Sequence, residues 1–369
     1  MPKATETILE IDLNALAHNY KYISSKVNPN TKILAVVKAN GYGSDDVIVA
    51  RELEKLGVAY FAVAYASEGL NLRDAKIETP ILVLHPLPVN FDLILERCLE
   101  PSIYSPKMLL EFIAFAEMKT QKNYPIHLKF NTGLNRLGFC ESDITWILEQ
   151  LQKTSSVKVK SIFSHLAATD DPSESKFTKK QLAGFRSISE KLTAKLGHTP
   201  ILHLLNTSGV LNYPEAQYDM VRTGIGLYGF GNSPEENKKL KPIATLKTVI
   251  SQIHKIEAGE SVGYNRAYTA TGAKTTATLP LGHADGISRA FGNGVGWVTI
   301  EGQKAPIVGN VCMDMIMVDI TNIKCQEGDE VVVFGTNPTA EELSTAVKSI
   351  PYELLTNVSR RIKRVVCRK

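Results

Sequence analysis

Lys38 is the residue of this sequence whose position could do chemistry most directly. It follows an apolar run, Ile33–Val37, and precedes the glycine-rich segment Gly41-Tyr42-Gly43. Five consecutive apolar residues indicate a strand buried on both faces, as in a parallel sheet. An amine at the end of such a strand either reaches solvent, which is the ordinary fate of a lysine, or is desolvated and can act as a neutral nucleophile or base.

Other basic and imidazole side chains stand near the ends of further strand-like runs. They are His85, Lys129, His165, His203 and Arg222, with Asn206 close to His203. Packing alone does not require such groups, so their repetition indicates a shared site. We expect His85 to be the exception, satisfied by a carbonyl of its own loop.

Two short glycine-containing segments offer a place for a phosphate. They read Asn206-Thr207-Ser208-Gly209 and Gly224-Ile225-Gly226, and their hydroxyls and backbone N–H groups suit a phosphate dianion. A phosphate site together with a lysine amine indicates pyridoxal phosphate, with the lysine forming a Schiff base. Gly224–Gly229 also matches the dinucleotide pattern G-x-G-x-x-G, but Phe230-Gly231-Asn232-Ser233-Pro234 follows instead of a helix, so we discard that interpretation.

The elements that must position these residues alternate between strand and helix. Over about 230 residues we expect eight strands, at 33–37, 59–64, 80–84, 99–104, 126–130, 159–164, 201–205 and 218–221. This alternation predicts an α/β fold, an N-terminal (β/α)8 TIM-type barrel over residues 1–240, with its chemistry at the carboxyl ends of the strands. The loops after strands seven and eight of such barrels recurrently hold phosphate.

The pattern changes near Ile243. Short β-rich runs with glycine turns follow, at 245–256, 275–280, 295–300, 305–308, 315–320 and 330–334. Helical stretches near 340–348 and 352–357 close the chain. We expect a second, mostly antiparallel β domain over residues 241–369.

Composition excludes several classes of protein. The 42 basic and 38 acidic residues give a net charge of only +4, too weak and dispersed for a nucleic-acid partner. No apolar stretch is long enough to cross a bilayer, and Met1–Ile11 lacks the apolar core of a signal peptide. The five cysteines show no metal-type spacing. We therefore expect a cytoplasmic protein without a metal site.

The sequence as a whole resembles the alanine racemase family, whose members are pyridoxal phosphate enzymes of fold type III with a barrel and a β domain. The similarity runs through nine segments in the family's order. They are Val37–Gly43, His127–Lys129, Thr132–Gly138, Phe163–His165, Val221–Gly229, Ser261–Tyr264, Ala284–Gly286, Val311–Asp314 and Pro351–Glu353.

The resemblance implies an isomerase that interconverts L- and D-alanine, with D-alanine used for cell-wall peptidoglycan, working as a homodimer with shared active sites. Lys38 resembles the lysine that holds the cofactor and serves as one catalytic base. Tyr264 resembles the second base, contributed by the β domain of the partner subunit. Two bases on opposite faces suffice to remove a proton from one side of a carbon and return it to the other.

The resemblance also implies the cofactor contacts. Arg222 matches the arginine that faces the pyridine nitrogen, His165 lies beside the ring and His203 behind Arg222. An arginine does not readily give up a proton, so the nitrogen stays unprotonated and transamination is disfavoured. The remaining positions match residues around the phosphate: Tyr42, Asn206, Thr207 or Ser208, Gly224, Ile225 and Tyr352.

Substrate contacts follow in the same way. Arg136 and the backbone of Met313, supported by Asp314, match the groups that bind the substrate carboxylate. Lys129 matches a lysine that family members often carbamylate, which would orient Arg136. A tyrosine base needs positive neighbours, for which His165 and Arg222 are the candidates.

Some positions depart from the family pattern. Gly41, Ser44, Asn131 and Leu134 replace usual residues near the site, and the last two departures, His283 and Asn310, affect the substrate entrance. They leave open a racemase of the same fold that takes serine or larger amino acids. A non-catalytic pyridoxal phosphate carrier would lack the β domain, and a related decarboxylase would carry a carboxylate where Arg222 stands.

Overall fold

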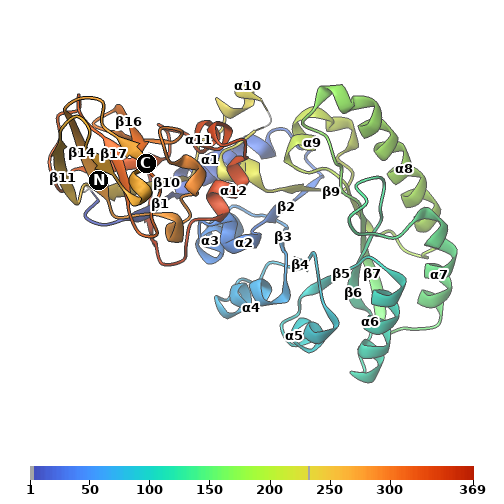
Figure 1. Ribbon diagram of the computed structural model, residues 1–369. Helices are drawn as coiled ribbons and strands as arrows, with labels where there is room; N and C mark the ends of the chain where they lie inside the picture. The colour runs from blue at the N-terminus through green and yellow to red at the C-terminus, as the bar shows by residue number, and fades with distance from the viewer. Residues whose placement is uncertain (1–3, 232) are drawn as a thin grey trace.

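The computed structural model describes residues 4–231 and 233–369; residues 1–3 of the N-terminal segment and Asn232 after the glycine motif lie outside this description. Two parts are visible in Figure 1, a barrel surrounded by helices and a β domain that also holds both chain ends.

Eight parallel strands close the barrel, as predicted. In order they are β2 (Lys32–Val36), β3 (Tyr60–Val63), β4 (Ile81–Val83), β5 (Glu100–Ile103), β6 (Tyr124–Lys129), β7 (Val157–Phe163), β8 (Ile201–His203) and β9 (Met220–Thr223). Strand β9 pairs with β2 in parallel, with Leu34 opposite Arg222, and this pairing closes the ring. The carboxyl ends of all eight strands therefore meet at one mouth.

One of the helices around the barrel precedes its first strand, and the others follow the strands in turn. The helices are α1 (Leu13–Ser24), α3 (Asp46–Lys55), α4 (Ala66–Asp74), α5 (Phe91–Glu96), α6 (Pro106–Met118), α7 (Ile144–Gln152), α8 (Ser175–Thr193) and α9 (Thr207–Asn212). Typical N-cap residues stand at the N-termini of several of these helices. Ser105 caps α6 ahead of a proline in the first turn, and Asp12 accepts hydrogen bonds from the first N–H groups of α1.

The β domain is built on a nine-stranded sheet in the order β11-β14-β17-β16-β15-β18-β10-β1-β19. Its strands are β1 (Ile8–Asp12), β10 (Ala244–Val249), β11 (Gln252–Ile256), β14 (Lys274–Leu279), β15 (Trp297–Ile300), β16 (Gln303–Val308), β17 (Ile316–Asp319), β18 (Glu330–Phe334) and β19 (Lys363–Cys367). All pairings are antiparallel except that of β1 with β19, which confirms the mostly antiparallel domain.

Two details differ from the expected pattern. The run 245–256 is two strands, because Ile250 and Ser251 bond to different neighbours, Asp329 and Thr278, where the chain crosses the sheet. Strand β1 was not expected. It belongs to the sheet of the β domain although it precedes the barrel in the chain. The predicted boundary at residue 240 would assign this strand to the barrel, and the boundary stays a prediction.

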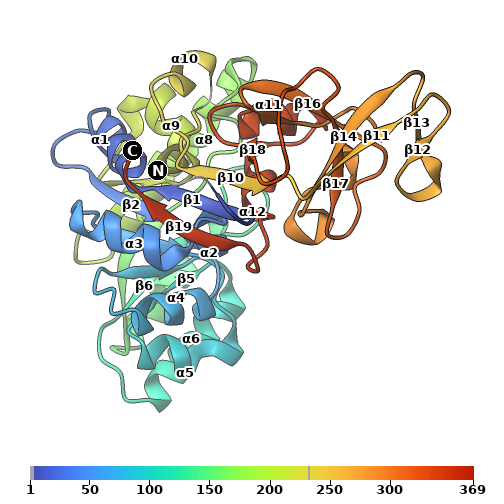
Figure 2. The same cartoon turned by 90° about the vertical axis from the view of Figure 1, so that its left-hand side faces the viewer.

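Three smaller features bear on the site. A separate hairpin of β12 (Ser261–Val262) and β13 (Tyr268–Thr269) projects from the β domain, at the edge away from the barrel in Figure 2. The helices α11 (Ala340–Ala346) and α12 (Pro351–Thr356) lie near the barrel mouth, where α12 packs on the turn α2 (Lys38–Tyr42).

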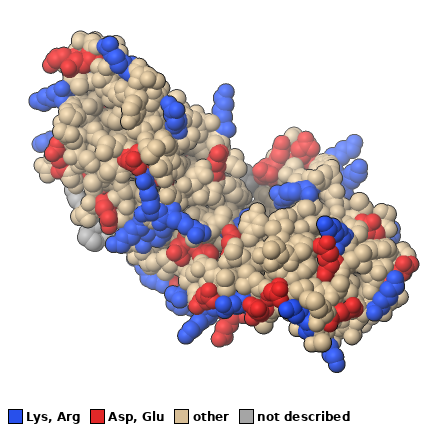
Figure 3. All heavy atoms as spheres, turned by 60° about the horizontal axis from the view of Figure 1, so that its bottom comes forward, with Lys and Arg blue, Asp and Glu red and all other residues tan. Residues whose placement is uncertain are grey.

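Charged side chains are spread over the surface. On the face shown in Figure 3, lysine and arginine are interspersed with aspartate and glutamate. Within the described residues, no helix is long and apolar enough to cross a membrane.

Candidate active site

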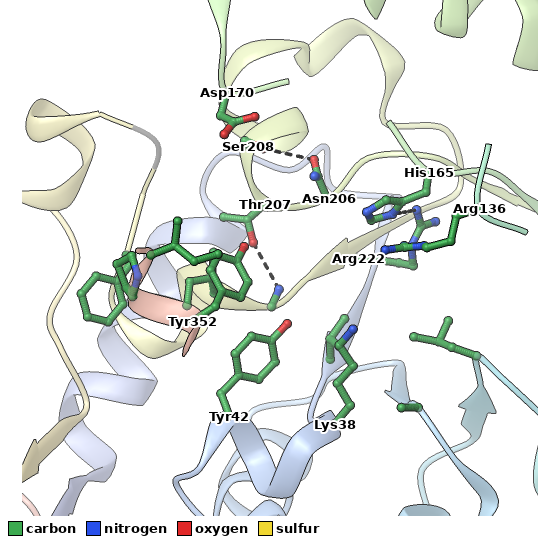
Figure 4. A pocket seen from close by; sticks show the side chains of 18 of the residues that line it. Lys38, Tyr42, Arg136, His165, Asp170, Asn206, Thr207, Ser208, Arg222 and Tyr352 are labelled. Carbon is green, nitrogen blue, oxygen red and sulfur yellow. Dashed lines mark hydrogen bonds between the residues drawn. The ribbon is translucent and has the colours of Figure 1, made fainter. Parts of the chain in front are cut away.

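A cavity of about 670 Å³ opens at the barrel mouth. Figure 4 shows Lys38 and Tyr42 on one side, Arg136, His165 and Arg222 on another, and Tyr352 reaching in from α12. The structure thus brings together twelve of the predicted site residues: Lys38, Tyr42, Lys129, Arg136, His165, Asn206, Thr207, Ser208, Arg222, Gly224, Ile225 and Tyr352.

The backbone after β2 aims Lys38 into this cavity through an unusual turn. Ala39, Asn40, Gly41 and Tyr42 all have positive φ, between 50° and 60°. Non-glycine residues seldom adopt this left-handed conformation, and runs of it persist only where surrounding contacts impose it. Glu68 supplies such contacts, since its carboxylate accepts hydrogen bonds from the backbone N–H groups of Ala39 (2.7 Å) and Ala64 (2.6 Å).

Positive charges gather around the cavity and alter the titration of its amines. Burial lowers the pKa of Lys38, and the charge of Arg136 lowers it further. Burial together with Arg136, Arg222 and Lys38 lowers the pKa of Lys129 to about 8. Both lysines are therefore more readily neutral than a lysine in water.

His165 experiences the same field. Burial and the charge of Arg222 hold the pKa of His165 well below its usual range. The imidazole is therefore neutral at pH 7. This corrects the expectation that His165 helps a tyrosine base by its positive charge; Arg222 remains as the cation.

Arg222 lies inside β9 and is almost fully buried, with 4% of its surface exposed. Its two terminal nitrogens donate to the carbonyls of Ser164 (2.6 Å), Leu204 (2.8 Å) and His203 (3.2 Å). They also donate to Nδ1 of His203 (2.8 Å) and Nδ1 of His165 (3.3 Å). Burial lowers the pKa of Arg222 to about 9, so it stays a cation at pH 7.

One donor of Arg222 is left over. A guanidinium has five N–H groups, and the terminal four are held by the acceptors just described. The Nε–H makes no hydrogen bond to any described residue. Arg222 lines the cavity, and Nε is not among the fully buried atoms without a partner, so this donor is open to the cavity, where an acceptor can bind.

The predicted phosphate segments meet across the mouth. Thr207 Oγ1 accepts hydrogen bonds from the N–H groups of Gly224 (3.1 Å) and Gly226 (3.4 Å), which ties the loop after β8 to the loop after β9. Ser208 and Asn206 are joined through Thr169 (2.6 and 2.9 Å). A Cβ at Gly224 would collide with the hydroxyl of Tyr42, so only glycine lets the loop approach this closely.

Comparison with known proteins supplies the family. The alanine racemase N-terminal domain matches residues 11–232, and the alanine racemase C-terminal domain matches residues 243–366. A protein named alanine racemase from Treponema denticola is 37% identical over 378 residues, covering 98% of each chain. The chain belongs to the alanine racemase family. It is accordingly an isomerase.

Solved structures of this family superpose closely on the chain. The alanine racemase of Clostridium difficile 630 is 33% identical with a TM-score of 0.93, covering 100% of this chain and 97% of that one. An alanine racemase from Bartonella henselae, described with covalently bound pyridoxal phosphate, is 31% identical with a TM-score of 0.90, covering 99% and 100% of the two chains.

Four predicted residues lie outside the cavity. His203 is buried behind Arg222, where the resemblance to alanine racemases placed it. Tyr264 follows β12 on the outlying hairpin and is 72% exposed. Met313 is also exposed, and Asp314 accepts a hydrogen bond from Arg361 at 2.7 Å. Their roles stay predictions.

Two residues at or next to the cavity were missed or misjudged from the sequence. Glu68 was missed, although a glutamate at the third position of a helix commonly accepts a hydrogen bond from the N-cap N–H, here that of Tyr65. His85 was expected to bond to a loop carbonyl. In the described structure its side chain has no hydrogen bond and instead packs between the rings of Tyr65 and Tyr104, with centroids 5.8 and 5.7 Å away. The two aromatic neighbours come from two other loops, which no local pattern reveals.

Proposed function

We propose that this alanine racemase homologue interconverts L- and D-alanine with pyridoxal phosphate bound to Lys38, and that a second copy of the chain supplies Tyr264 as the opposing base. The observation that carries the proposal is the meeting of the Lys38 amine, the spare Nε–H of Arg222 and a hydroxyl-lined glycine loop in one cavity. The covalently bound cofactor of the Bartonella henselae relative supports it.

The donor set suits pyridoxal phosphate at both of its ends. Thr207, Ser208 and the backbone of Ile225 would hold the phosphate, with the hydroxyls of Tyr42 and Tyr352 beside them. Burial and the nearby charge of Asp170 raise the pKa of Tyr352 to about 12, so this hydroxyl stays protonated and can donate to an anion. The Nε–H of Arg222 would take the ring nitrogen as its acceptor.

Pyridoxal phosphate, when bound, supplies the electron-withdrawing ring that makes the α-proton of an amino acid acidic. Lys38 takes or returns that proton on one face, helped by the lowered pKa of its amine. Tyr264 does so on the other face. Arg222 keeps its own proton and so leaves the ring nitrogen unprotonated, which limits side reactions such as transamination.

The second base requires a dimer. Tyr264 is exposed and lies on a hairpin that projects away from the barrel of its own chain (Figure 2). A twofold arrangement would place this hairpin over the barrel mouth of a partner, and the same for the partner's hairpin. Exposed Met313 would arrive with it, offering a backbone N–H that bonds to no described residue.

Arg136 would bind the substrate carboxylate in a bidentate manner. Arg136 lines the cavity and is exposed in the single chain, so its guanidinium is accessible to a substrate. A carbamate on Lys129 would orient it by charge. The D-alanine formed would serve peptidoglycan synthesis.

A substrate panel tests this function. Purified protein with pyridoxal phosphate is given L-alanine, L-serine, L-lysine or L-arginine, and the products are separated on a chiral column. We expect the highest kcat/KM for alanine. A serine rate above the alanine rate would instead support the broader racemase that Asn310 and His283 leave open, and no racemisation of any substrate would favour a cofactor carrier.

A further inference from the structure

A line of buried polar side chains leads from Arg222 into the barrel, away from the cavity. Nδ1 of His203 lies 2.8 Å from Arg222, and Nε2 of His203 lies 2.9 Å from Ser161 Oγ. Ser161 Oγ is 2.6 Å from His127 Nδ1, and His127 Nε2 is 2.7 Å from a carboxylate oxygen of Glu100. His203, Ser161 and His127 are all fully buried.

Chemistry at the two ends fixes the direction of this line. An arginine only donates, so Nδ1 of His203 must accept and its proton must sit on Nε2. That proton goes to Ser161, whose own proton then goes to Nδ1 of His127. His127 in turn donates its Nε2–H to Glu100, which as a carboxylate only accepts. Every proton in the line points from the cavity toward Glu100.

Burial favours the arrangement in which every polar group of the line has a hydrogen-bond partner. Each of these groups would lose stability if left without a partner in the barrel interior. Burial raises the pKa of Glu100, but the hydrogen bonds that it accepts from His127 and Tyr60, together with the charge of Lys160, lower it, so Glu100 is an anion. Tyr60 also donates to this carboxylate at 3.2 Å.

We propose that Glu100 is a positioning residue for the reaction: through His127, Ser161 and His203 it holds Arg222 in the orientation that presents Nε–H to the cavity. The role assigned to Arg222 rests on the proposed function. The line itself does not, because it is defined by hydrogen bonds within the chain.

Ser161→Ala breaks the line at its centre, and Ser102→Ala is a matched control. Ser102 lies in the neighbouring strand opposite His127, is as fully buried as Ser161, and its hydroxyl has no hydrogen-bond partner in the described structure. The two substitutions remove the same atom from the same interior. Only one of them removes a link.

Nitrogen NMR of histidine side chains reads the line directly in the protein purified with pyridoxal phosphate. We expect His203 and His127 to be neutral with the proton on Nε2 in the unmodified protein and in Ser102→Ala. In Ser161→Ala the Nε2–H signals should broaden or shift. A doubly protonated His127, or a proton on Nδ1 of His203, in the unmodified protein would overturn the proposal.

Kinetics then tests the consequence for the reaction. Ser161→Ala and Glu100→Gln should lower kcat about tenfold with little change in KM, the usual scale for a residue that orients a functional group. Ser102→Ala should keep the original kcat. Equal losses in both serine variants, or full activity in Ser161→Ala, would contradict the positioning role. An unmodified protein without racemase activity would instead refute the proposed function and would leave the NMR result valid.

If Ser161→Ala fails to fold, Glu100→Gln provides both measurements, because it keeps an acceptor oxygen but removes the charge.

Discussion

The amine of Lys38 differs from that of a surface lysine because of what surrounds it. It sits on a left-handed turn that Glu68 holds in place, and Arg136 adds positive charge nearby. Both burial and like charge favour the neutral amine. A neutral amine is the form that can bind a carbonyl cofactor and accept a proton.

Lysine-bound pyridoxal phosphate gives an absorbance band at the violet end of the visible spectrum, and Lys38→Ala should abolish this band. The same variant should lower the rate of racemisation by about 10²–10⁴-fold. The measurement is an absorbance spectrum of the purified, dialysed variant. Lys129→Gln, at the only other lysine that lines the cavity among the described residues, is the control and should keep the band. Persistence of the band in Lys38→Ala would show that a different lysine holds the cofactor.

Lys129 should react with carbon dioxide in a pH-dependent way. Its pKa of about 8 means that the neutral amine, the form that is carbamylated, becomes dominant as the pH rises through 8, whereas an ordinary lysine stays protonated there. Protein equilibrated with ¹³C-bicarbonate should show one carbamate signal by NMR that grows between pH 7 and pH 9. Lys129→Gln should lack the signal, and a signal that survives this substitution would assign it elsewhere.

The proposed phosphate site depends on two elements approaching closely. The turn α2 brings Tyr42 under the loop after β9, and the ring of Tyr42 stacks on Tyr228 with centroids 4.3 Å apart. Thr207 joins that loop to the start of α9. The backbone of Gly224 fills the space in between, so a side chain there has to displace one of these elements.

Gly224→Ala should weaken cofactor binding about tenfold or more, since overpacking of this kind costs about 1–3 kcal/mol. Gly272→Ala is the control, because its added methyl group would meet nothing within 4 Å and its backbone does not require glycine. Titration of each apo-protein with pyridoxal phosphate, followed by fluorescence, measures the dissociation constants. Equal affinities in the two variants would remove Gly224 from the phosphate site.

Elements with strong local patterns were predictable, and those held by distant contacts were not. The alternation of strands and helices was sufficient to predict the eight-stranded barrel, and the polar strand ends indicated part of the cavity lining. Tyr42, Arg136 and Tyr352 were predicted only from the resemblance to alanine racemases. The left-handed turn after Lys38 was hidden, since the contacts around it come from Glu68 on α4 and from α12, which lie elsewhere in the chain. Strand β1 was missed because its partners, β10 and β19, lie more than 200 residues away.

The line from Arg222 to Glu100 illustrates the same limit. His127 and Lys129 are two residues apart on one strand and so share a face, which the sequence shows. Glu100 and Ser161 belong to the two neighbouring strands, β5 and β7, and reach His127 only when these strands pair with β6. Strand pairing, rather than any local spacing, puts Glu100, His127 and Ser161 in contact.

The whole molecule separates the two proposed bases. Lys38 is at the barrel mouth, while Tyr264 is on the hairpin that projects from the opposite end of the β domain (Figure 2). In a single chain, only Lys38 of the two proposed bases lies at the cavity. A reaction that uses both bases therefore needs a second copy of the chain.

A mixed dimer tests whether the two bases come from different chains. Chains carrying Lys38→Ala and chains carrying Tyr264→Phe, with different affinity tags, are co-expressed, and dimers that hold one of each are purified by two successive affinity steps. If each site takes Lys38 from one chain and Tyr264 from the other, one of the two sites is intact, and racemisation should return to about half of the unmodified level although both parent variants are nearly inactive. If activity stays at the level of the parents, Lys38 and Tyr264 do not meet across two chains, and the account is wrong.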